Sequence, residues 1–462
     1  MDFPVGATCW NYNDKVGIFS LSKRPCIVKY PDLMLESSQP LTIAAVGCGA
    51  RSRTYCKIAM SFGHTRYRVT AGADPVPERR EAMARISDNP DFLAFNSADE
   101  LLAQDRLADV LIIGTQDNYH FEPARRALEK GYHLLLEKPA AQTLDETLEL
   151  ARLARKHNRR ILLCFVLRYT DFYSKVHSIV RSGQLGDVIS IQATEGVEAW
   201  HQAHSFVRGH WGNTSASTPM IVAKCSHDTD YISWLMASRC TAVSSFGRLS
   251  HFTEAHAPEG ATDRCTSACP HAAPQGGNCM YDSHLYLGKH ARWLDMVYPH
   301  PTERSDEDVL EWLKTSQWGR CAWKCDNDAV DHQVVNMEFE NGGTASLTMT
   351  AFDCGRSIEI YGTQATLRGG DAFKKFSGAD ITIRNHASSK TEFITLEVPK
   401  DDGYQGHGGG DYGLVNAMDA IFRGQGPDSS LIENSIEGHL IGFAAEESRL
   451  AGGMPVRLDR LH

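Results

Sequence analysis

The pattern of apolar and polar residues changes near residue 168 and divides the chain into two parts. Over residues 41–167, short runs of consecutive apolar residues alternate with stretches of helical periodicity. A short, continuous apolar run is typical of a strand buried on both faces, and strict alternation with helices requires a parallel sheet that is covered on both sides. The pattern therefore predicts an α/β domain with a doubly wound sheet over residues 41–167.

The expected elements of this first domain follow one another closely. Thr143 and Glu146 have the spacing of a capping box, which marks the start of one helix. The predicted strands are 41–46, 68–73, 109–114, 133–136 and 160–165, and the predicted helices are 52–60, 77–86, 122–130 and 143–157.

Residues 168–462 follow a different rhythm, with long strands and few intervening helices. Asn341-Gly342 is a strong hairpin signal between two of these strands. We predict an α+β domain with a large, mostly antiparallel open sheet, interrupted at about 253–328 by an insertion that contains proline, cysteine and tryptophan. Its predicted strands are 188–196, 330–339 and 344–351, and its predicted helices are 172–182, 412–423 and 432–450.

Composition narrows the class of function. Lys and Arg number 47 against 57 Asp and Glu, a formal net charge of −10, which is poorly suited to binding nucleic acid or an anionic membrane. No apolar run approaches the roughly 18 residues that a membrane span needs. Residues 1–40 lack a secretory signal pattern, and we expect them to pack on the body or stay partly loose. The 13 mostly scattered cysteines favour free thiols in a reducing compartment, so we expect a cytoplasmic protein.

A glycine-rich segment at residues 47–51 joins the first predicted strand to its helix. Gly47 permits a tight turn, Gly49 permits close approach of a pyrophosphate, and the helix start offers free N–H groups. Such a fingerprint is weak alone, but here it stands between the right strand and helix. We therefore predict a Rossmann dinucleotide-binding domain. The residues expected at the cofactor are Gly47, Gly49, Ala50 and Arg51.

Asp74 ends the second predicted strand, where a carboxylate can accept hydrogen bonds from the ribose hydroxyls of NAD. The same charge would repel a 2′-phosphate, so NAD is favoured over NADP, although Arg51 or Arg79 could still reach a phosphate. The alternative is that Asp74 only caps the next helix through an Asp-Pro turn.

Two further loops follow strands on the same edge of the sheet, where the cofactor crevice of such folds lies. Lys138, after the strand 133–136, is expected near the nicotinamide, where an ammonium can stabilise a developing alkoxide or donate to a carbonyl. The alternative for any lysine is a solvated surface charge. The other residues expected to contact the cofactor are Thr115, Asn118, His120, Glu137 and Arg168.

From Leu41 to its C-terminus the chain resembles the glucose–fructose oxidoreductase, inositol dehydrogenase and rhizopine-catabolism (Gfo/Idh/MocA) family. The resemblance implies a Rossmann domain followed by an α+β domain whose open sheet makes subunit contacts in a homodimer or homotetramer. It also implies a catalytic lysine that works beside a histidine of the second domain. The segments that carry the resemblance are Gly47-Cys48-Gly49, Asp74-Pro75, Thr115 with His120, Glu137-Lys138-Pro139, and His227-x-x-Asp230.

The second-domain segment departs from the family pattern at one position. Many members have an aspartate four residues before the histidine, but here Ala223 stands there, so the usual lysine–aspartate–histidine trio is incomplete. His227 keeps its place and is expected to act as a general acid or base, unless it is only a hydrogen-bonded residue at a helix start. Lys224 is a second candidate, because it could add a cation that lowers the pKa of its neighbours.

Residues 200–211 concentrate histidine, arginine and tryptophan, a mixture that suits sugar binding because aromatic faces cover C–H patches. The alternative is a surface loop with aromatic anchors. The residues expected at the substrate are His201, His204, Arg208, Trp211 and Asp230.

Three cysteines of the insertion, Cys265, Cys269 and Cys279, form the densest cysteine cluster of the sequence. With a histidine they could complete a structural zinc site, but the spacings are not those of a zinc knuckle. We favour reduced packing thiols and assign no metal.

Taken together, these residues predict an NAD(P)-dependent enzyme that transfers a hydride between nicotinamide and a hydroxyl-bearing carbon of a sugar, sugar derivative or cyclitol. Some relatives on this fold are glycosidases that oxidise a sugar transiently and then eliminate the glycoside, which is the first alternative. The second is a non-catalytic sugar sensor, which would not need Lys138 and His227 as an acid–base pair.

Overall fold

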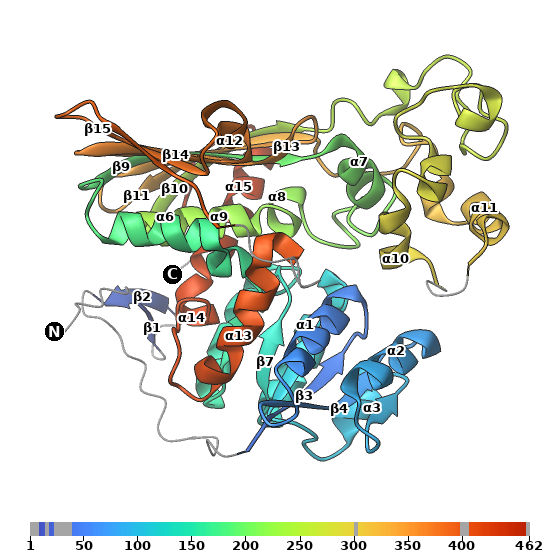
Figure 1. The fold of residues 1–462 in the computed structure, drawn as a ribbon, viewed down its shortest axis with the longest axis horizontal. Helices are drawn as coiled ribbons and strands as arrows, with labels where there is room; N and C mark the ends of the chain where they lie inside the picture. Colours follow the sequence, from blue (N-terminus) through green and yellow to red (C-terminus); the bar gives the residue numbers. More distant parts are fainter. Residues whose placement is uncertain (1–8, 14–17, 23–38, 300–303, 398–405, 459–462) are drawn as a thin grey trace.

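The computed structural model describes residues 9–13, 18–22, 39–299, 304–397 and 406–458. The ribbon shows a lower α/β body, an upper sheet seen nearly edge-on, and an extra lobe beside that sheet (Figure 1). The upper sheet and the lower body meet through helices, so residues from both parts can contribute to one site.

The first domain has a six-stranded parallel sheet in the order β5-β4-β3-β6-β7-β8. All five predicted strands and all four predicted helices are present, with ends shifted by at most a few residues. The strands are β3 (Leu41–Val46), β4 (Tyr67–Ala73), β5 (Leu93–Phe95), β6 (Val110–Ile113), β7 (His133–Leu136) and β8 (Ile161–Leu163). The helices are α1 (Ala50–Ser61), α2 (Pro77–Ser87), α3 (Ala98–Ala103), α4 (Phe121–Glu129) and α5 (Leu144–Lys156).

The capping box predicted at the start of α5 is confirmed. The Thr143 side chain accepts from the Glu146 N–H, and the Glu146 side chain accepts from the Thr143 N–H. Two orphan donors of the first helical turn are thereby satisfied.

The second domain has a nine-stranded sheet in the order β16-β15-β14-β13-β9-β12-β11-β10-β17. Only β9 and β12 pair in parallel; the other neighbours are antiparallel, so the predicted fold class is confirmed. The strands are β9 (Val188–Val197), β10 (Cys240–Arg248), β11 (His332–Phe339), β12 (Thr344–Thr350), β13 (Cys354–Gly362), β14 (Ala365–Gly370), β15 (Ile381–Asn385), β16 (Thr391–Ile394) and β17 (Val456–Arg457).

The predicted hairpin joins β11 to β12. Gly342 has φ +83°, a left-handed conformation that glycine adopts without a steric penalty, and its N–H donates to the carbonyl of Phe339. The turn therefore sets the register in which the two strands pair.

Helices cover one face of this large sheet. Helices α6 (Asp171–Arg181), α9 (Ser226–Met236) and α15 (Glu437–Leu450) lie between it and the first domain (Figure 1). The single helix predicted over 432–450 is two helices, because α14 (Ile432–Ser435) ends before α15 begins.

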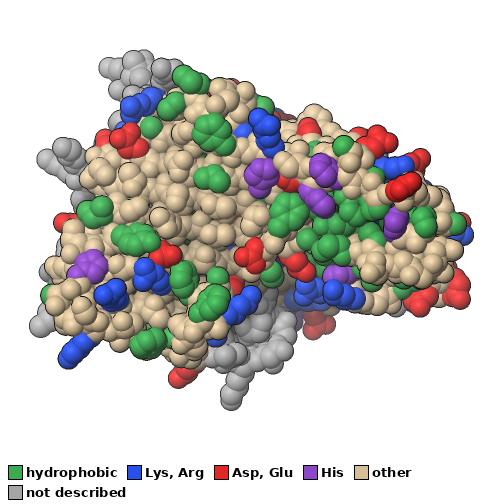
Figure 2. Space-filling view, turned by 90° about the horizontal axis from the view of Figure 1, so that it is seen from above, with side chains coloured by type: hydrophobic (Ala, Val, Ile, Leu, Met, Phe, Trp, Pro, Cys, Tyr) green, Lys and Arg blue, Asp and Glu red, His purple; other side chains and the backbone are tan. Residues whose placement is uncertain are grey.

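The other face of the sheet carries α12 (Asp371–Ser377) against β13 and β14 and is otherwise largely uncovered (Figure 1). Exposed hydrophobic side chains on its strands include Ile189, Phe246 and Val334. Figure 2 looks down on this side and shows hydrophobic side chains spread over it. Sheet faces of monomeric proteins seldom carry many exposed apolar side chains.

Helix α13 (Gly410–Phe422) belongs to the second part of the sequence but packs on the first domain. Leu414, Val415 and Phe422 are buried in the same apolar cluster as Tyr55 of α1 and Tyr67 of β4. The Rossmann sheet is thus covered on one side by a helix from near the end of the sequence.

The insertion builds its own small cores beyond β10. One cluster contains Trp200, Tyr286, Trp293 and Trp318, together with residues of α11 (Asp306–Thr315). In the N-terminal extension, β1 (Cys9–Asn13) and β2 (Ile18–Ser22) form an antiparallel pair, and residues 1–8, 14–17 and 23–38 of the expected extension lie outside the described residues. None of the helices that the structure describes has the length and apolar character of a membrane span.

Candidate active site

The glycine turn after β3 leaves a helix start free of side chains. Gly47 has φ +82°, and a Cβ there would stand 2.7 Å from the carbonyl oxygen of Gly114, so only glycine fits. A Cβ on Gly49 would meet nothing within 4 Å, and Gly49 caps α1 without a side-chain hydrogen bond. The open space and the uncapped N–H groups at Ala50 and beyond fit a dinucleotide pyrophosphate.

The carboxylate of Asp74 accepts hydrogen bonds from backbone N–H groups of the protein. One oxygen accepts from the Cys48 N–H and the other from the Val76 N–H, both at 2.9 Å, and the residue is buried. The bond to Val76 is the turn contact given above as the alternative to ribose binding. Arg79 Nη1 lies 3.9 Å from the same carboxylate. The ribose contact of Asp74 stays a prediction.

Glu137 connects the end of β7 to the glycine turn. Its Oε1 accepts from Arg51 Nε at 2.8 Å and from the Tyr55 hydroxyl at 2.7 Å. Burial alone would raise the pKa of Glu137, but the charge and hydrogen bond of Arg51 hold it below its usual value. Glu137 therefore stays ionised and fixes the chain just before Lys138.

Arg51 is held by a second carboxylate from a remote part of the sequence. Its Nη2 and Nη1 donate to the two oxygens of Asp411 at 2.6 and 2.9 Å, a bidentate pair. Arg51 was predicted to touch the cofactor; in the structure its guanidinium bridges Glu137 and Asp411 beside the helix start.

Lys138 reaches across to the second domain. Its Nζ donates to the backbone carbonyl of Ala223 at 2.7 Å. Burial lowers the pKa of Lys138, while the nearby carboxylates of Glu137 and Asp117 oppose that shift. The ammonium thus contacts the backbone at the position where many family members carry an aspartate.

His227, at the start of α9, is buried beside this lysine. Burial lowers its pKa well below the usual value, and the positive charges of Lys138 and Arg356 add to the effect. Its Nδ1 has no hydrogen-bond partner within the described parts of the chain. A neutral imidazole with a free nitrogen can accept a proton from a hydroxyl group.

Lys224 is engaged by a buried network. Its Nζ lies 2.8 Å from Glu195 Oε1, and the other oxygen of Glu195 lies 2.8 Å from Arg356 Nε. Arg356 also pairs with Asp228. These contacts give Lys224 a role in holding β9 and α9 together, and its catalytic role stays a prediction.

The loop after β6 anchors the two domains to each other. Asp117, buried, accepts from Trp211 Nε1 at 3.0 Å and from the hydroxyls of Ser217 and Thr218, also at 3.0 Å. Trp211 thus uses its N–H in this anchor. Asn118 lies on the exposed part of the loop, and its predicted contact with the cofactor stays a prediction.

The ring of His120 contacts backbone carbonyl groups of this loop and of the segment after Lys138. The two ring nitrogens of His120 lie 2.8 Å from the Pro139 carbonyl oxygen and 3.2 Å from that of Thr115. His120 is therefore placed to tie the loop after β6 to the segment that follows Lys138.

Arg168 and Asp230 pair with each other. Two hydrogen bonds of 2.7 and 2.6 Å join the guanidinium to the carboxylate, and both side chains are buried. Arg168 Nη1 also donates to the Ser429 carbonyl at 2.5 Å. Their predicted contacts with cofactor and substrate stay predictions.

The histidine- and tryptophan-rich segment 200–211 has one histidine near Lys138 and another in contact with the insertion. His201 lies near Lys138, since burial and the charges of Lys224, His204 and Lys138 all lower its pKa. His204 is bonded to the Tyr286 hydroxyl within the insertion. Of the two histidines, His201 is the one that the structure brings to the candidate site.

Arg208 points into the insertion. It donates to the carbonyls of Arg320 and Tyr281 at 2.7 and 2.5 Å, and its Nη2 lies 3.7 Å from Cys265 Sγ. These contacts hold Arg208 against the insertion, and its predicted role in substrate binding stays a prediction.

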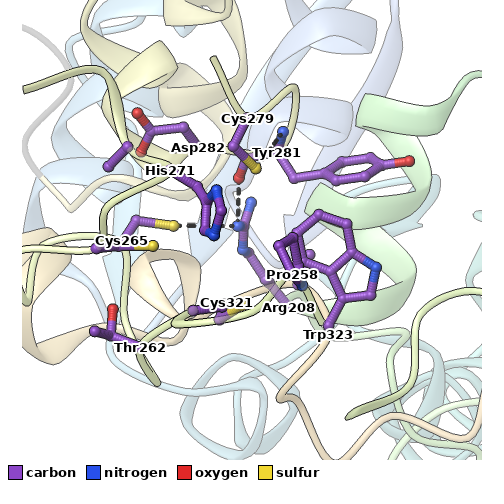
Figure 3. Close-up of a pocket in the computed structure, with 14 residues that line it drawn as sticks. Arg208, Pro258, Thr262, Cys265, His271, Cys279, Tyr281, Asp282, Cys321 and Trp323 are labelled. Carbon is purple, nitrogen blue, oxygen red and sulfur yellow. Dashed lines mark hydrogen bonds between the residues drawn. The ribbon is translucent and has the colours of Figure 1, made fainter. Parts of the chain in front are cut away.

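A pocket of the insertion collects the clustered thiols around Arg208 (Figure 3). Cys265, Cys269, Cys279 and Cys321 all line it, and every cysteine that the structure describes is a free thiol. Across the described residues, no three metal-binding side chains are grouped closely enough to hold an ion.

Several residues of the candidate site were missed in the sequence: Tyr55, Asp117, Glu195, His407 and Asp411. Asp117 stands in the loop that was singled out, but an aspartate that anchors a domain carries no distinctive spacing. His407 and Asp411 flank a run of three glycines, and that run was the available signal.

Comparison with known families decides the classification. An oxidoreductase family with an NAD-binding Rossmann fold (GFO_IDH_MocA) matches residues 41–165, and the GFO/IDH/MocA C-terminal domain matches residues 173–368. The chain belongs to the Gfo/Idh/MocA family. Residues 41–165 are its NAD-binding domain, and the protein is an NAD-binding oxidoreductase of this family.

Individual members of the family are only distantly similar. The oxidoreductase YteT of Bacillus subtilis is 22% identical over 403 residues, which cover 83% of this chain and 89% of YteT. An inositol 2-dehydrogenase of Corynebacterium glutamicum is 26% identical over 168 residues, or 36% of this chain and 46% of that protein.

Two solved structures show the same fold. The scyllo-inositol dehydrogenase of Lactobacillus casei, with bound NAD(H) and scyllo-inositol, has a TM-score of 0.59 at 17% identity and covers 91% of this chain and 99% of its own. The WlbA dehydrogenase of Bordetella pertussis, in complex with NADH and UDP-GlcNAcA, has a TM-score of 0.60 at 16% identity, with the same two coverages.

Proposed function

We propose that the protein transfers a hydride between nicotinamide and a hydroxyl-bearing carbon of a sugar, sugar derivative or cyclitol, with Lys138 and His227 at the reacting oxygen. The observation that carries the proposal is the contact of Lys138 Nζ with the Ala223 carbonyl, which holds the ammonium between the two domains and beside the buried His227.

Bound NAD would supply the carbon that accepts or returns the hydride, and the glycine turn with the start of α1 would hold its pyrophosphate. The residues of the chain then manage charge and protons. Lys138 donates a hydrogen bond to the substrate oxygen and stabilises negative charge as the O–H bond weakens. His227, kept neutral by burial, accepts the hydroxyl proton.

The network behind Lys138 fixes its direction. Glu137 is held by Arg51 and Tyr55, and Arg51 is held by Asp411. A side chain that must act on one atom of a substrate needs such support, because a displacement of about 1 Å can cost a hundredfold in rate.

The charges near the site support an uncharged, hydroxyl-rich substrate. Arg51 is paired with Glu137 and Asp411, and Lys224 is paired with Glu195, so neither offers an unpaired cation to a carboxylate or phosphate group. His201, close to Lys138, can hydrogen-bond a second hydroxyl. The inositol dehydrogenases among the relatives support the same class.

We further propose that the protein is at least a dimer in which the open face of the nine-stranded sheet is buried between subunits. The exposed apolar side chains of β9, β10 and β11 on that sheet support this. The free thiols of the described cysteines support the expected cytoplasmic location.

A substrate panel tests the proposed function. Purified protein is incubated with NAD and each of a set of sugars, sugar acids and cyclitols, and the appearance of reduced nicotinamide is followed by absorbance. We expect turnover with at least one hydroxyl substrate, and turnover slower by about a hundredfold or more with Lys138→Ala. Hydrolysis of a glycoside without net reduction of NAD would instead favour the glycosidase alternative, and tight sugar binding with no reaction would favour a sensor.

A further inference from the structure

Oxidation of a hydroxyl group leaves a proton inside the site, and this proton has to reach water. The hydride leaves the carbon with both electrons, whereas the hydroxyl proton stays with the protein. His227, the proposed proton acceptor, is buried at 6% exposure. A group between His227 and solvent is therefore needed for each turnover.

His407 stands at that position. Its ring centroid lies 6.3 Å from that of His227, and its side chain is 43% exposed. At this spacing one water molecule can bridge the facing ring edges. His407 is thus in contact with solvent on one side and with the surroundings of His227 on the other.

The backbone holds His407 in an uncommon conformation. Its φ and ψ are 53° and 40°, in the left-handed region, and Gly408 and Gly409 follow with φ of 62° and 83°. A non-glycine residue in this region costs free energy and persists where the surrounding structure requires it, commonly at functional sites. Directly afterwards, α13 begins at Gly410.

Asp411 orients the imidazole. Its Oδ2 lies 3.1 Å from His407 Nδ1, so Nδ1–H donates to the carboxylate and Nε2 is left to exchange protons. Although burial would raise the pKa of Asp411, hydrogen bonds from Arg51 and His407 hold it well below its usual range. The carboxylate is therefore ionised throughout the neutral range, as in other His–Asp pairs where the acid fixes the tautomer.

We propose that His407, oriented by Asp411, is the proton relay between His227 and solvent in this enzyme. The hydroxyl proton passes to His227, from His227 to His407 Nε2, and from there to water, while the reverse order delivers a proton during carbonyl reduction. Three charged or titratable groups face His407. They are Asp411 of α13, His227 of α9, and Arg51 of α1, whose Nη1 lies 3.5 Å from His407 Nδ1.

The relay rests on the proposed function. It adds His407 and Asp411, which are not part of the family's lysine–aspartate–histidine trio. The aspartate position of that trio is Ala223 here, so this chain lacks that carboxylate beside the lysine. The His407–Asp411 pair brings a carboxylate-supported acid–base group to the same region from the C-terminal part of the sequence.

Kinetics with chemical rescue test the relay. His407→Gln is compared with His386→Gln, an exposed histidine that bonds Thr366 at the far side of the large sheet. We expect His407→Gln to lower kcat by roughly tenfold to a hundredfold, the scale of a lost proton-transfer group, with KM and NAD affinity little changed. Added imidazole should restore turnover, whereas an equal ionic strength of chloride should not. His386→Gln should behave as wild type.

Two results would overturn the relay. One is unchanged kcat in His407→Gln at every buffer concentration. The other is a loss of kcat that imidazole does not restore, which would assign His407 a structural role. If wild-type protein turns over no hydroxyl substrate, the proposed function itself fails, and the second measurement then decides the relay separately.

That second measurement needs no cofactor or substrate. NMR titration of the histidine ring signals in the free protein follows His227 with and without His407. His407 lowers the pKa of His227 when it is protonated, so His407→Gln should raise the pKa of His227, while His386→Gln should leave it unchanged. An unchanged His227 titration in both variants would show that the two rings do not communicate, and the relay would be rejected.

Discussion

At the scale of single residues, the site depends on groups that hold one another rather than on isolated reactive side chains. Glu137 and Lys138 are consecutive, yet the first is fixed by Arg51 and the second contacts Ala223 of the other domain. The sequence predicts which residues are reactive because their types and places are distinctive. It does not predict Asp411, because the partner of Arg51 is 360 positions away.

Lys138→Ala should lower kcat by about a hundredfold or more, the usual scale for a lost acid–base group, while NAD affinity changes little. Lys138→Arg should not restore activity, because a guanidinium does not lose its proton and has a different shape. Turnover and NAD titration on both variants measure this, with Lys57→Ala on the exposed side of α1 as the control. Near wild-type kcat in Lys138→Ala would transfer the leading role to Lys224.

Buried neutral histidines should make stability fall in acid. Burial lowers the pKa of His439 to about 3, whereas an unfolded histidine titrates near 6.5. As the pH falls from 6.5 toward 3, the unfolded chain binds a proton that folded His439 does not, so the free energy of unfolding decreases across that window, by at most about 1.4 kcal/mol per pH unit for one histidine.

Denaturant titrations between pH 7 and pH 4 measure this effect. His439→Gln can still accept the hydrogen bond from the Ala140 N–H through its amide oxygen and should show a shallower loss of stability with falling pH. The exposed His386→Gln should keep the wild-type slope. Equal slopes in all three proteins would contradict a buried, neutral His439.

At the scale of elements, the periodic segments were predicted well and the short or irregular ones were not. The predicted strand 133–136 coincides with β7, and the helix predicted over 143–157 matches α5 and its capping box. By contrast, β5 has three residues and an exposed Leu93, so the apolar run 92–95 that contains it is a weak signal and was not predicted as a strand. Strands such as β15 and β16 at the sheet edge are short and partly exposed, and their pattern is equally weak.

The cysteine pocket of the insertion should be structural. Cys265→Ser places a polar hydroxyl in a buried site, so we expect a loss of stability of about 1 to 3 kcal/mol with turnover retained. Thermal unfolding, turnover and elemental analysis of the purified protein measure this, with the exposed Cys354→Ser as the matched control. Loss of turnover without loss of stability would overturn the structural role, and one zinc per chain would replace packing thiols with a metal centre.

At the scale of the whole molecule, the two domains share one site because hydrogen bonds join residues of one domain to residues of the other. Asp117 of the first domain accepts from Trp211, Ser217 and Thr218 of the second, and Lys138 contacts Ala223. The sequence predicted two domains and the order of their elements. It did not predict these hydrogen bonds between the domains, because they depend on how the domains pack.

The open sheet face should be a subunit interface. Phe246→Glu places a charge at an exposed apolar position of β10, and we expect it to shift a dimer or tetramer toward monomer. Leu93→Glu on β5 of the first domain is the control, since it changes an exposed apolar residue away from that face. Light scattering at micromolar concentration measures both variants. A monomeric wild-type protein would refute the interface.

The position of α13 has a consequence for how the protein forms during synthesis. The Rossmann sheet is translated first, but one of its sides is covered by Leu414, Val415 and Phe422, which leave the ribosome only after nearly all of the chain has been made. The early domain must therefore wait with an apolar side uncovered, a state that favours aggregation or chaperone binding. A ribosome-bound chain that stops before α13 should consequently be far more sensitive to protease than one that includes it.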